Sequence, residues 1–321
     1  MTPPRHRLHI VSGKGGTGKT TIAGALACAL AAGGRRVLVC EVEGRHGVAE
    51  LFGVDRLIDA EERRICRTPS GGVVYGLAID AEDAFLEYID TFFHLRLAAR
   101  ALDRFGAVDF ATSIAPGLRD VLLTGKVYEA VRRSDKGRPD AYDAVVLDAP
   151  PTGRIAQFLN VHAAVAGLAR IGPIRDQADS IMRMLKSTTT AVHLVTLLED
   201  MPVTEAEEAV AALRPTGISV QTVIENKVIT TPLDDDQLQR ASTGTTMLQV
   251  GSLTDRQNRL LTAEFADEAA RTLQQRERHL RLTSLGVPLA MVALDAAGID
   301  EAALFAIAER LQEQIDLEVS A

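Results

Sequence analysis

The stretch that decides the fold is Ser12-Gly13-Lys14-Gly15-Gly16-Thr17-Gly18-Lys19-Thr20-Thr21. It follows a short apolar run, residues 8–11, and leads into an Ala-rich run, residues 22–32, so it joins an expected strand to an expected helix. Residues 13–20 fit G-x-x-x-x-G-K-[ST], the phosphate-binding loop of nucleotide triphosphatases. The sequence therefore predicts a P-loop fold of class α/β.

Each residue type in this loop has a physical reason to be there. Glycines let successive backbone N–H groups curl around phosphates, and the helix that follows adds the positive end of its dipole. Lys19 is expected to neutralise the β- and γ-phosphates of ATP, and the Thr20 hydroxyl to ligate Mg²⁺. The expected nucleotide contacts are Gly13, Lys14, Gly15, Gly16, Thr17, Gly18, Lys19, Thr20 and Thr21. A chance glycine-rich turn is the alternative, and the complete spacing between strand and helix argues against it.

Composition narrows the class of protein. The chain has 321 residues, of which 46% are hydrophobic and 24% charged, as in ordinary globular proteins. The net charge of −8 argues against a general nucleic-acid binder, which would carry a basic stripe. The first residues show no signal-peptide core, and the longest uncharged run, residues 20–34, is too short to span a bilayer. We therefore expect a cytoplasmic protein that does not insert into membranes.

Three cysteines, Cys28, Cys40 and Cys66, are spread through the first 66 residues without a C-x-x-C pair. Cys28 lies in the Ala-rich helix and Cys40 in an expected strand, so both are interpreted as small buried hydrophobic residues. This pattern fits a reducing compartment.

Apolar runs rich in β-branched residues alternate with helical patterns, which indicates βαβ units around a mainly parallel sheet. We predict one P-loop domain over residues 1–321, with three layers in the order α/β/α. A capping-box pattern at Thr204–Glu207 predicts a helix that starts there and runs to about Arg214. The expected strands are residues 8–12, 36–42, 73–79, 144–148, 191–198, 218–226 and 287–294.

Two helical stretches interrupt the alternation, at about residues 80–133 and 154–187. The first is interpreted as a helical insertion, and it holds five of the nine phenylalanines: Phe85, Phe92, Phe93, Phe105 and Phe110. Its aromatic face either binds an apolar protein client or packs onto the sheet and a dimer mate. Packing is the favoured interpretation, because aromatic side chains are usually buried.

Asp148 ends the apolar run 144–148 and precedes Ala149-Pro150-Pro151-Thr152-Gly153-Arg154. A carboxylate at the end of a buried strand, downstream of a P-loop, is placed to orient Mg²⁺ or its waters. Asp148 is therefore the second expected metal residue beside Thr20.

Several motifs together resemble the arsenite-pump (ArsA-like) ATPases of the SIMIBI class, and most closely their paired actinobacterial members. These motifs are SGKGGTGKTT, CEVEGRHG, SIAPGLRD, LDAPPTGR, LLEDMPVTEAEEA and VIENK. Lys14 is a lysine that the deviant P-loop carries in addition to Lys19. The resemblance implies that it reaches across a dimer interface to the partner's nucleotide. It further implies that Gly153, in a segment resembling switch II, senses the γ-phosphate, and that Asn226 reads adenine.

Glu43 is a departure from the family pattern. It aligns with the switch I aspartate that positions the attacking water in the family, and its carboxylate reaches one methylene further. Because a small misplacement of a catalytic group can cost about 10²-fold, slow hydrolysis is expected. The alternative is that Glu43 is a solvated residue after a strand.

Other departures concern the known activities of the family. No cysteine falls where the resemblance would place a thiolate site for arsenite, and no C-x-x-C zinc clamp is present. The expected function is an ATPase whose nucleotide state controls a homodimer or a heterodimer with a homologous subunit. The alternative is a regulatory or scaffold subunit with little or no hydrolysis. A membrane-surface ATPase is disfavoured, because the polar face of the expected terminal helix, 300–317, is mainly acidic.

Overall fold

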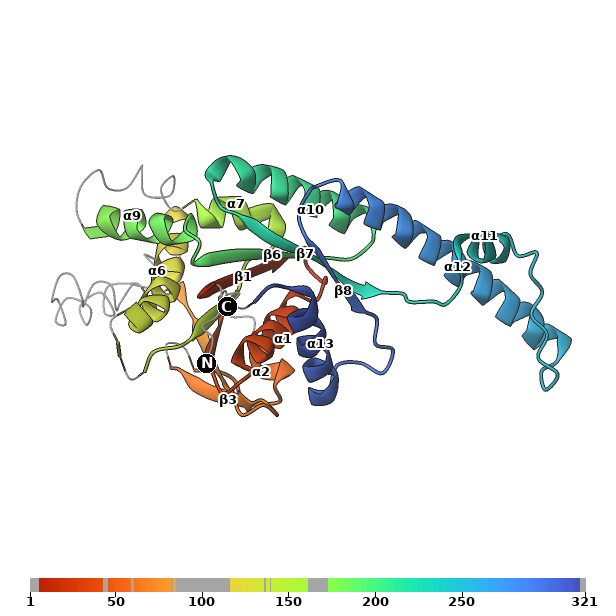
Figure 1. Ribbon diagram of the computed structural model, residues 1–321, viewed down its shortest axis with the longest axis horizontal. Coiled ribbons are helices and arrows are strands. Elements are labelled where there is room, and N and C mark those ends of the chain that lie inside the picture. Colours follow the sequence, from red (N-terminus) through yellow and green to blue (C-terminus); the bar gives the residue numbers. More distant parts are fainter. Residues whose placement is uncertain are drawn as a thin grey trace, which may run out of the picture.

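The computed structural model describes residues 6–42, 46–58, 61–81, 83–84, 116–135, 137–138, 140–160 and 173–317. They form an eight-stranded sheet in the order β3-β4-β2-β5-β1-β6-β7-β8 (Figure 1). All neighbouring strands are parallel except β3 and β4, which pair antiparallel at one edge. The strands are β1 (Leu8–Gly13), β2 (Arg36–Val42), β3 (Arg63–Arg67), β4 (Val73–Ile79), β5 (Ala144–Asp148), β6 (Thr190–Thr196), β7 (Val220–Val228) and β8 (Leu289–Ala293).

Helices cover both faces of this sheet. On one face, α6, α7, α9 and α10 share a hydrophobic core with the strands, and on the other face α1, α2 and α13 share a second core. This arrangement confirms the predicted three-layer α/β/α class. The helices just named are α1 (Lys19–Ala31), α2 (Gly47–Leu51), α6 (Pro116–Asp135), α7 (Thr152–Leu159), α9 (Pro173–Leu185), α10 (Asp200–Leu213) and α13 (Glu301–Gln314).

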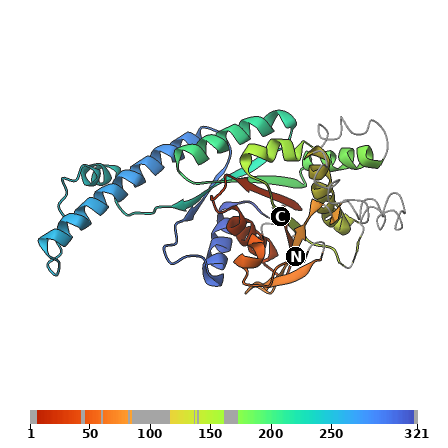
Figure 2. The same cartoon turned by 180° about the vertical axis from the view of Figure 1, so that it is seen from behind.

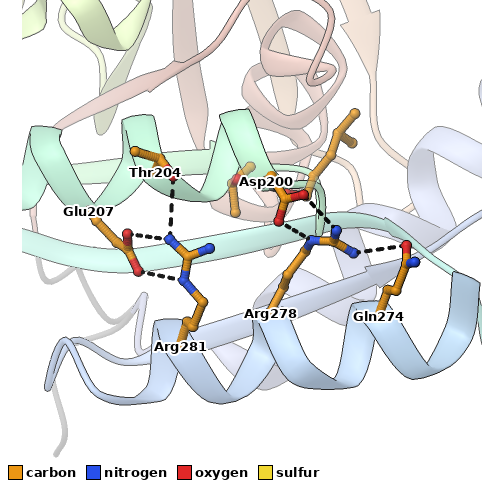
Figure 3. A network of polar contacts seen from close by, with 8 residues as sticks. Asp200, Thr204, Glu207, Gln274, Arg278 and Arg281 are labelled. Carbon is orange, nitrogen blue, oxygen red and sulfur yellow. Dashed lines mark hydrogen bonds and ion pairs between the residues drawn. The ribbon is translucent and has the colours of Figure 1, made fainter.

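The seven expected strands are all present, with ends that differ by a few residues. Strand β3 was not expected, because its sequence, Arg-Arg-Ile-Cys-Arg, is mostly charged and exposed, as an edge strand allows. The predicted helix start at Thr204 is wrong, since α10 begins at Asp200. The two capping-box side chains, Thr204 and Glu207, accept hydrogen bonds from Arg281 and do not cap the helix (Figure 3).

Two helices project from the body of the protein, an arrangement that the sequence did not predict. They are α11 (Asp235–Ser242) and α12 (Asp255–Thr283), and together with the loop between them they form an arm (Figures 1 and 2). Within the arm, α11 packs on α12 through a small apolar cluster around Leu238, Ala241 and Ala269. The arm leaves the sheet after β7 and returns through α12 to the start of β8.

The base of the arm is fixed to α10 by a network of polar contacts (Figure 3). Arg278 donates to both carboxylate oxygens of Asp200, each at 2.9 Å. Arg281 donates to both carboxylate oxygens of Glu207, at 3.2 and 2.7 Å. Paired Arg–carboxylate contacts of this kind fix orientation as well as position. The C-terminal half of α12 is therefore held against the body of the protein.

The aromatic insertion and the domain layout stay predictions. Of residues 80–133, those from 85 to 115 lie outside the described residues, and with them all five phenylalanines named above. The described part of the stretch 154–187 is largely helical, in α7 and α9. No helix among the described residues is long and apolar enough to cross a membrane.

Candidate functional site

The P-loop lies between β1 and α1, where its glycines adopt backbone conformations that other residues rarely reach. Gly16 and Gly18 have φ angles of 85° and 87°, which L-residues with a side chain disfavour. A Cβ atom added at Gly13 would collide with the carbonyl oxygen of Val195 on β6. The loop shape thus depends on these three glycines, as the motif predicts.

Several donors converge on the carbonyl oxygen of Lys14 inside the loop. The backbone N and the hydroxyl of Thr17 donate to it at 3.3 and 2.8 Å, and Lys19 Nζ at 3.3 Å. The side chain of Lys19, the first residue of α1, is almost fully buried. Its charge therefore lies beside the loop and the positive end of the helix, where an anion is favoured.

The expected metal residues lie in direct contact. Thr20 Oγ1 donates a 2.6 Å hydrogen bond to Asp148 Oδ2, and Asp148 ends the central strand β5. No group of three or more His, Cys, Asp or Glu that could hold a metal occurs among the described residues. Mg²⁺ suits the site formed by Thr20 and Asp148, because it binds few protein oxygens and takes waters and phosphates as its remaining ligands.

Lys14 contacts its own chain in this structure. Its Nζ lies 2.9 Å from Glu205 Oε1 on α10, and Glu205 Oε2 accepts a 3.0 Å hydrogen bond from Thr152 Oγ1. One carboxylate therefore joins the P-loop, the start of α7 and α10. Sequence reasoning missed Glu205, although the motif LLEDMPVTEAEEA, which contains it, was recognised as a family segment.

Gly153 lies beside the P-loop strand, near the start of α7. The preceding turn is held to β1 by two hydrogen bonds, from Ser12 Oγ to the Pro150 carbonyl at 2.7 Å and from the Ala149 N–H to the Val11 carbonyl at 2.9 Å. Gly153 itself is exposed, with no other heavy atom within 4 Å of the position of a Cβ. It is therefore open to a ligand, as its predicted role requires.

Asn226 contacts the P-loop from β7. Its Nδ2 donates to the Thr17 carbonyl at 2.8 Å, and its Oδ1 accepts from the Lys227 N–H at 3.0 Å. One N–H and one oxygen lone pair of the amide remain for a base. The adenine contact stays a prediction, and the structure adds a second task, support of the loop.

Burial raises the pKa of the carboxyl group of Glu225, the residue before Asn226. This carboxyl group accepts a hydrogen bond from His279 on α12 at 2.8 Å.

Glu43 falls in the segment 43–45, outside the described residues. The described flanks show another carboxylate, Glu41, which is buried on β2 and paired in register with Asp148. Glu41 Oε2 accepts a 2.9 Å hydrogen bond from the Val48 N–H at the start of α2. Glu41 thus positions the chain after the segment that resembles switch I. Nothing in the sequence separated this task from that of an ordinary strand residue.

Comparison with known proteins agrees with this geometry. The family model described as anion-transporting ATPase matches residues 6–189 and 174–249. ATPase BagA of Mycobacterium tuberculosis is 47% identical over 317 residues, 96% of this chain and 93% of that protein. ATPase GET3 of Kluyveromyces lactis is 25% identical over 273 residues, 73% of this chain and 76% of that protein. These matches confirm the predicted ArsA-like resemblance, and the chain belongs to the anion-transporting ATPase family.

Proposed function

We propose that the protein is a Mg²⁺-dependent ATPase whose bound nucleotide controls its association with a second subunit. The subunit is either a second copy of the chain or a homologous ATPase. The observation that carries this proposal is the meeting of the P-loop, the Thr20–Asp148 contact and Thr152 at the carboxyl ends of β1 and β5. This is the place where parallel α/β sheets bind ligands.

Each side chain has a separate task in hydrolysis. Lys19 neutralises charge on the transferred phosphoryl group, and the loop N–H groups hold the phosphates. Thr20 and Asp148 would hold Mg²⁺, which supplies further positive charge to the phosphate oxygens. Glu43 positions the attacking water. The exposed Gly153 responds to the γ-phosphate, because its N–H can approach a ligand without obstruction by a side chain.

Lys14 links hydrolysis to association. In the single subunit its ammonium group is neutralised by Glu205. To reach a partner's nucleotide it must leave that carboxylate, and a triphosphate in the partner offers a stronger counter-charge. Binding of ATP on both sides of the interface would therefore favour the closed pair.

Arsenite is not the proposed substrate. Soft As(III) requires accessible thiolates, and all three cysteines, Cys28, Cys40 and Cys66, are buried in this structure. Burial also raises the pKa of the Cys40 thiol, which disfavours its thiolate. We propose that the protein works in the cytoplasm, as the cysteine pattern suggests.

The decisive experiment measures phosphate release by the wild type, Glu43→Ala and Glu43→Asp. We expect slow but measurable release by the wild type, loss of at least about 10²-fold in Glu43→Ala, and activity at or above wild type in Glu43→Asp. Solution mass in ADP and in a non-hydrolysable ATP analogue is measured beside it, with and without a homologous subunit. Equal, negligible phosphate release by all three proteins would overturn the assignment as an enzyme and favour a regulatory subunit. A solution mass that is the same with either nucleotide would overturn the proposed control of association by nucleotide.

Replacing Glu205 by glutamine is expected to favour the closed pair. The substitution removes the charge that holds Lys14 but keeps a hydrogen-bond acceptor for Thr152. Because exposed ion pairs are worth about 0.2–1 kcal/mol, association in the ATP analogue should tighten by about two- to fivefold. Analytical ultracentrifugation measures this change, with Glu208→Gln on the exposed side of α10 as the matched control. Weaker association of Glu205→Gln would contradict the proposed release of Lys14.

A further inference from the structure

The distal half of α12 carries an exposed row of side chains on the side away from α11. Its members, here called the outer stripe, are Arg256, Arg259, Leu260, Ala263, Glu264 and Asp267, and all are exposed. At about 100° per residue they fall within an arc of about 140°. Phe265, Ala269 and Leu273, which pack against α11, lie on the opposite side of the helix. The outer stripe is therefore a face that the arm itself does not use.

The charges of the outer stripe differ from three arginines in the basal half of α12. In the basal half, Arg276, Arg278 and Arg281 each form an ion pair with a residue outside α12. Among the described residues, no hydrogen bond or ion pair is found for the side chains of the four charged members of the outer stripe. Leu260, at the centre, is 58% exposed. Charges that have no partner within the chain remain available to pair with complementary charges on another surface.

The order of the charges is self-complementary. The two arginines precede the midpoint between residues 261 and 262, and the two acids follow that midpoint at the same distances along the helix. A second α12 in antiparallel orientation, centred between residues 261 and 262, would place Arg256 against the partner's Asp267 and Arg259 against the partner's Glu264. Two-fold symmetry repeats each pair, and Leu260 would lie on the partner's Ala263. We propose that the outer stripe binds the outer stripe of a second copy of this chain.

The placement of the arm agrees with this contact. The chain enters the arm from the carboxyl end of β7, and the P-loop follows the carboxyl end of the parallel strand β1. The arm therefore extends from the same edge of the sheet as the nucleotide site (Figure 1). The inference rests on the proposed function only in its choice of a second subunit, because the stripe contact itself requires no nucleotide.

Charge and size determine how strong this contact is. Exposed ion pairs are weak and screened by salt, and a single pair of helices covers less surface than a stable dimer needs. The stripe contact alone should therefore be weak and salt-sensitive. Once subunits are joined by it, the nucleotide-dependent contact forms at a raised effective concentration. The arm would thus select the partner before ATP closes the pair.

A charge-swap experiment tests the inference on the full-length protein. The variants are Arg256→Glu/Arg259→Glu and its complement Glu264→Arg/Asp267→Arg, with Arg67→Glu/Arg310→Glu on other exposed surfaces as the control. Each stripe variant should associate with itself at least about tenfold more weakly than wild type at low salt. A mixture of the two should recover association, because the surviving charges of one copy then match the new charges of the other. Circular dichroism verifies that each variant is folded.

Three outcomes separate this inference from the proposed function. Unchanged self-association of both stripe variants, or failure of the mixture to recover it, would overturn the stripe contact. If the swap pattern is found but association ignores ADP and the ATP analogue, the stripe contact holds and the nucleotide switch fails. If wild type and all variants associate equally strongly and respond equally to ADP and the ATP analogue, the nucleotide switch holds and the stripe contact fails.

Discussion

Replacement of Lys19 by alanine should abolish nucleotide-dependent behaviour almost completely. The Lys19 ammonium group is nearly buried and lies within the P-loop, 3.3 Å from the Lys14 carbonyl. Its removal takes away the only lysine charge at the start of α1. Loss of one preorganised donor to a developing charge costs about 10²–10³ in rate. Phosphate release should therefore fall by at least about 10²-fold, and calorimetry should show much weaker ATP binding.

Lys14→Ala gives the informative contrast to Lys19→Ala. Lys14 is directed at Glu205 and about a third exposed, so its loss should leave ATP binding by the single subunit nearly unchanged. Hydrolysis should fall only where a pair forms, and it should lose its dependence on protein concentration. Lys186→Ala, on an exposed position after α9, serves as the control for loss of a lysine. Lys19→Ala with wild-type binding and turnover would contradict the assignment of the P-loop.

The sequence predicted the parts of the site that depend on local backbone geometry. Positive φ at Gly16 and Gly18 and the strand-to-helix junction are properties of a few consecutive residues, so the motif determines them. Thr20 and Asp148 were expected as the two metal residues, and they lie in contact because parallel strands bring their carboxyl ends to one edge. A few residue types at fixed spacing were enough for this part of the site.

The sequence did not predict contacts between distant segments. Asn226 supports the carbonyl of Thr17, 209 positions away, and Glu205 joins Lys14 to Thr152 across three elements. These contacts depend on how helices pack on the sheet, which spacing does not encode. The arm was missed for a related reason. Much of α12 contacts only α11, so its apolar side is narrow, and its sequence is mainly polar.

A pair of buried histidines at the centre of the sheet has a defined protonation state. His9 on β1 and His193 on β6 are both fully buried, and their rings stack. His9 Nε2 donates to the carbonyl of His6 at 3.1 Å, so His9 Nδ1 is an acceptor. It accepts from His193 Nε2 at 3.0 Å. Protonation of His9 would therefore place two N–H groups against each other.

This pair should make the protein strongly sensitive to acid. Burial and the neighbouring His6 lower the pKa of His9 to about 3, and burial beside His9 lowers that of His193 well below its usual value. The unfolded chain binds protons below about pH 6.5 while the folded chain does not, so stability is lost as pH falls. Each histidine contributes up to about 1.4 kcal/mol per pH unit. The two together should remove about 5 kcal/mol between pH 6.5 and 4.5, comparable with the whole stability of many domains.

Urea denaturation at pH 7.5, 6.5, 5.5 and 4.5 measures this loss as the free energy of unfolding. The double variant His9→Gln/His193→Leu should flatten the dependence between pH 6.5 and 4.5, because glutamine keeps a donor for the His6 carbonyl and neither residue titrates. An equally steep slope in the double variant would show that carboxylates outside this pair govern acid unfolding. A flattened slope would assign the loss of stability in acid to the two neutral imidazoles of His9 and His193, which are buried between the central strands.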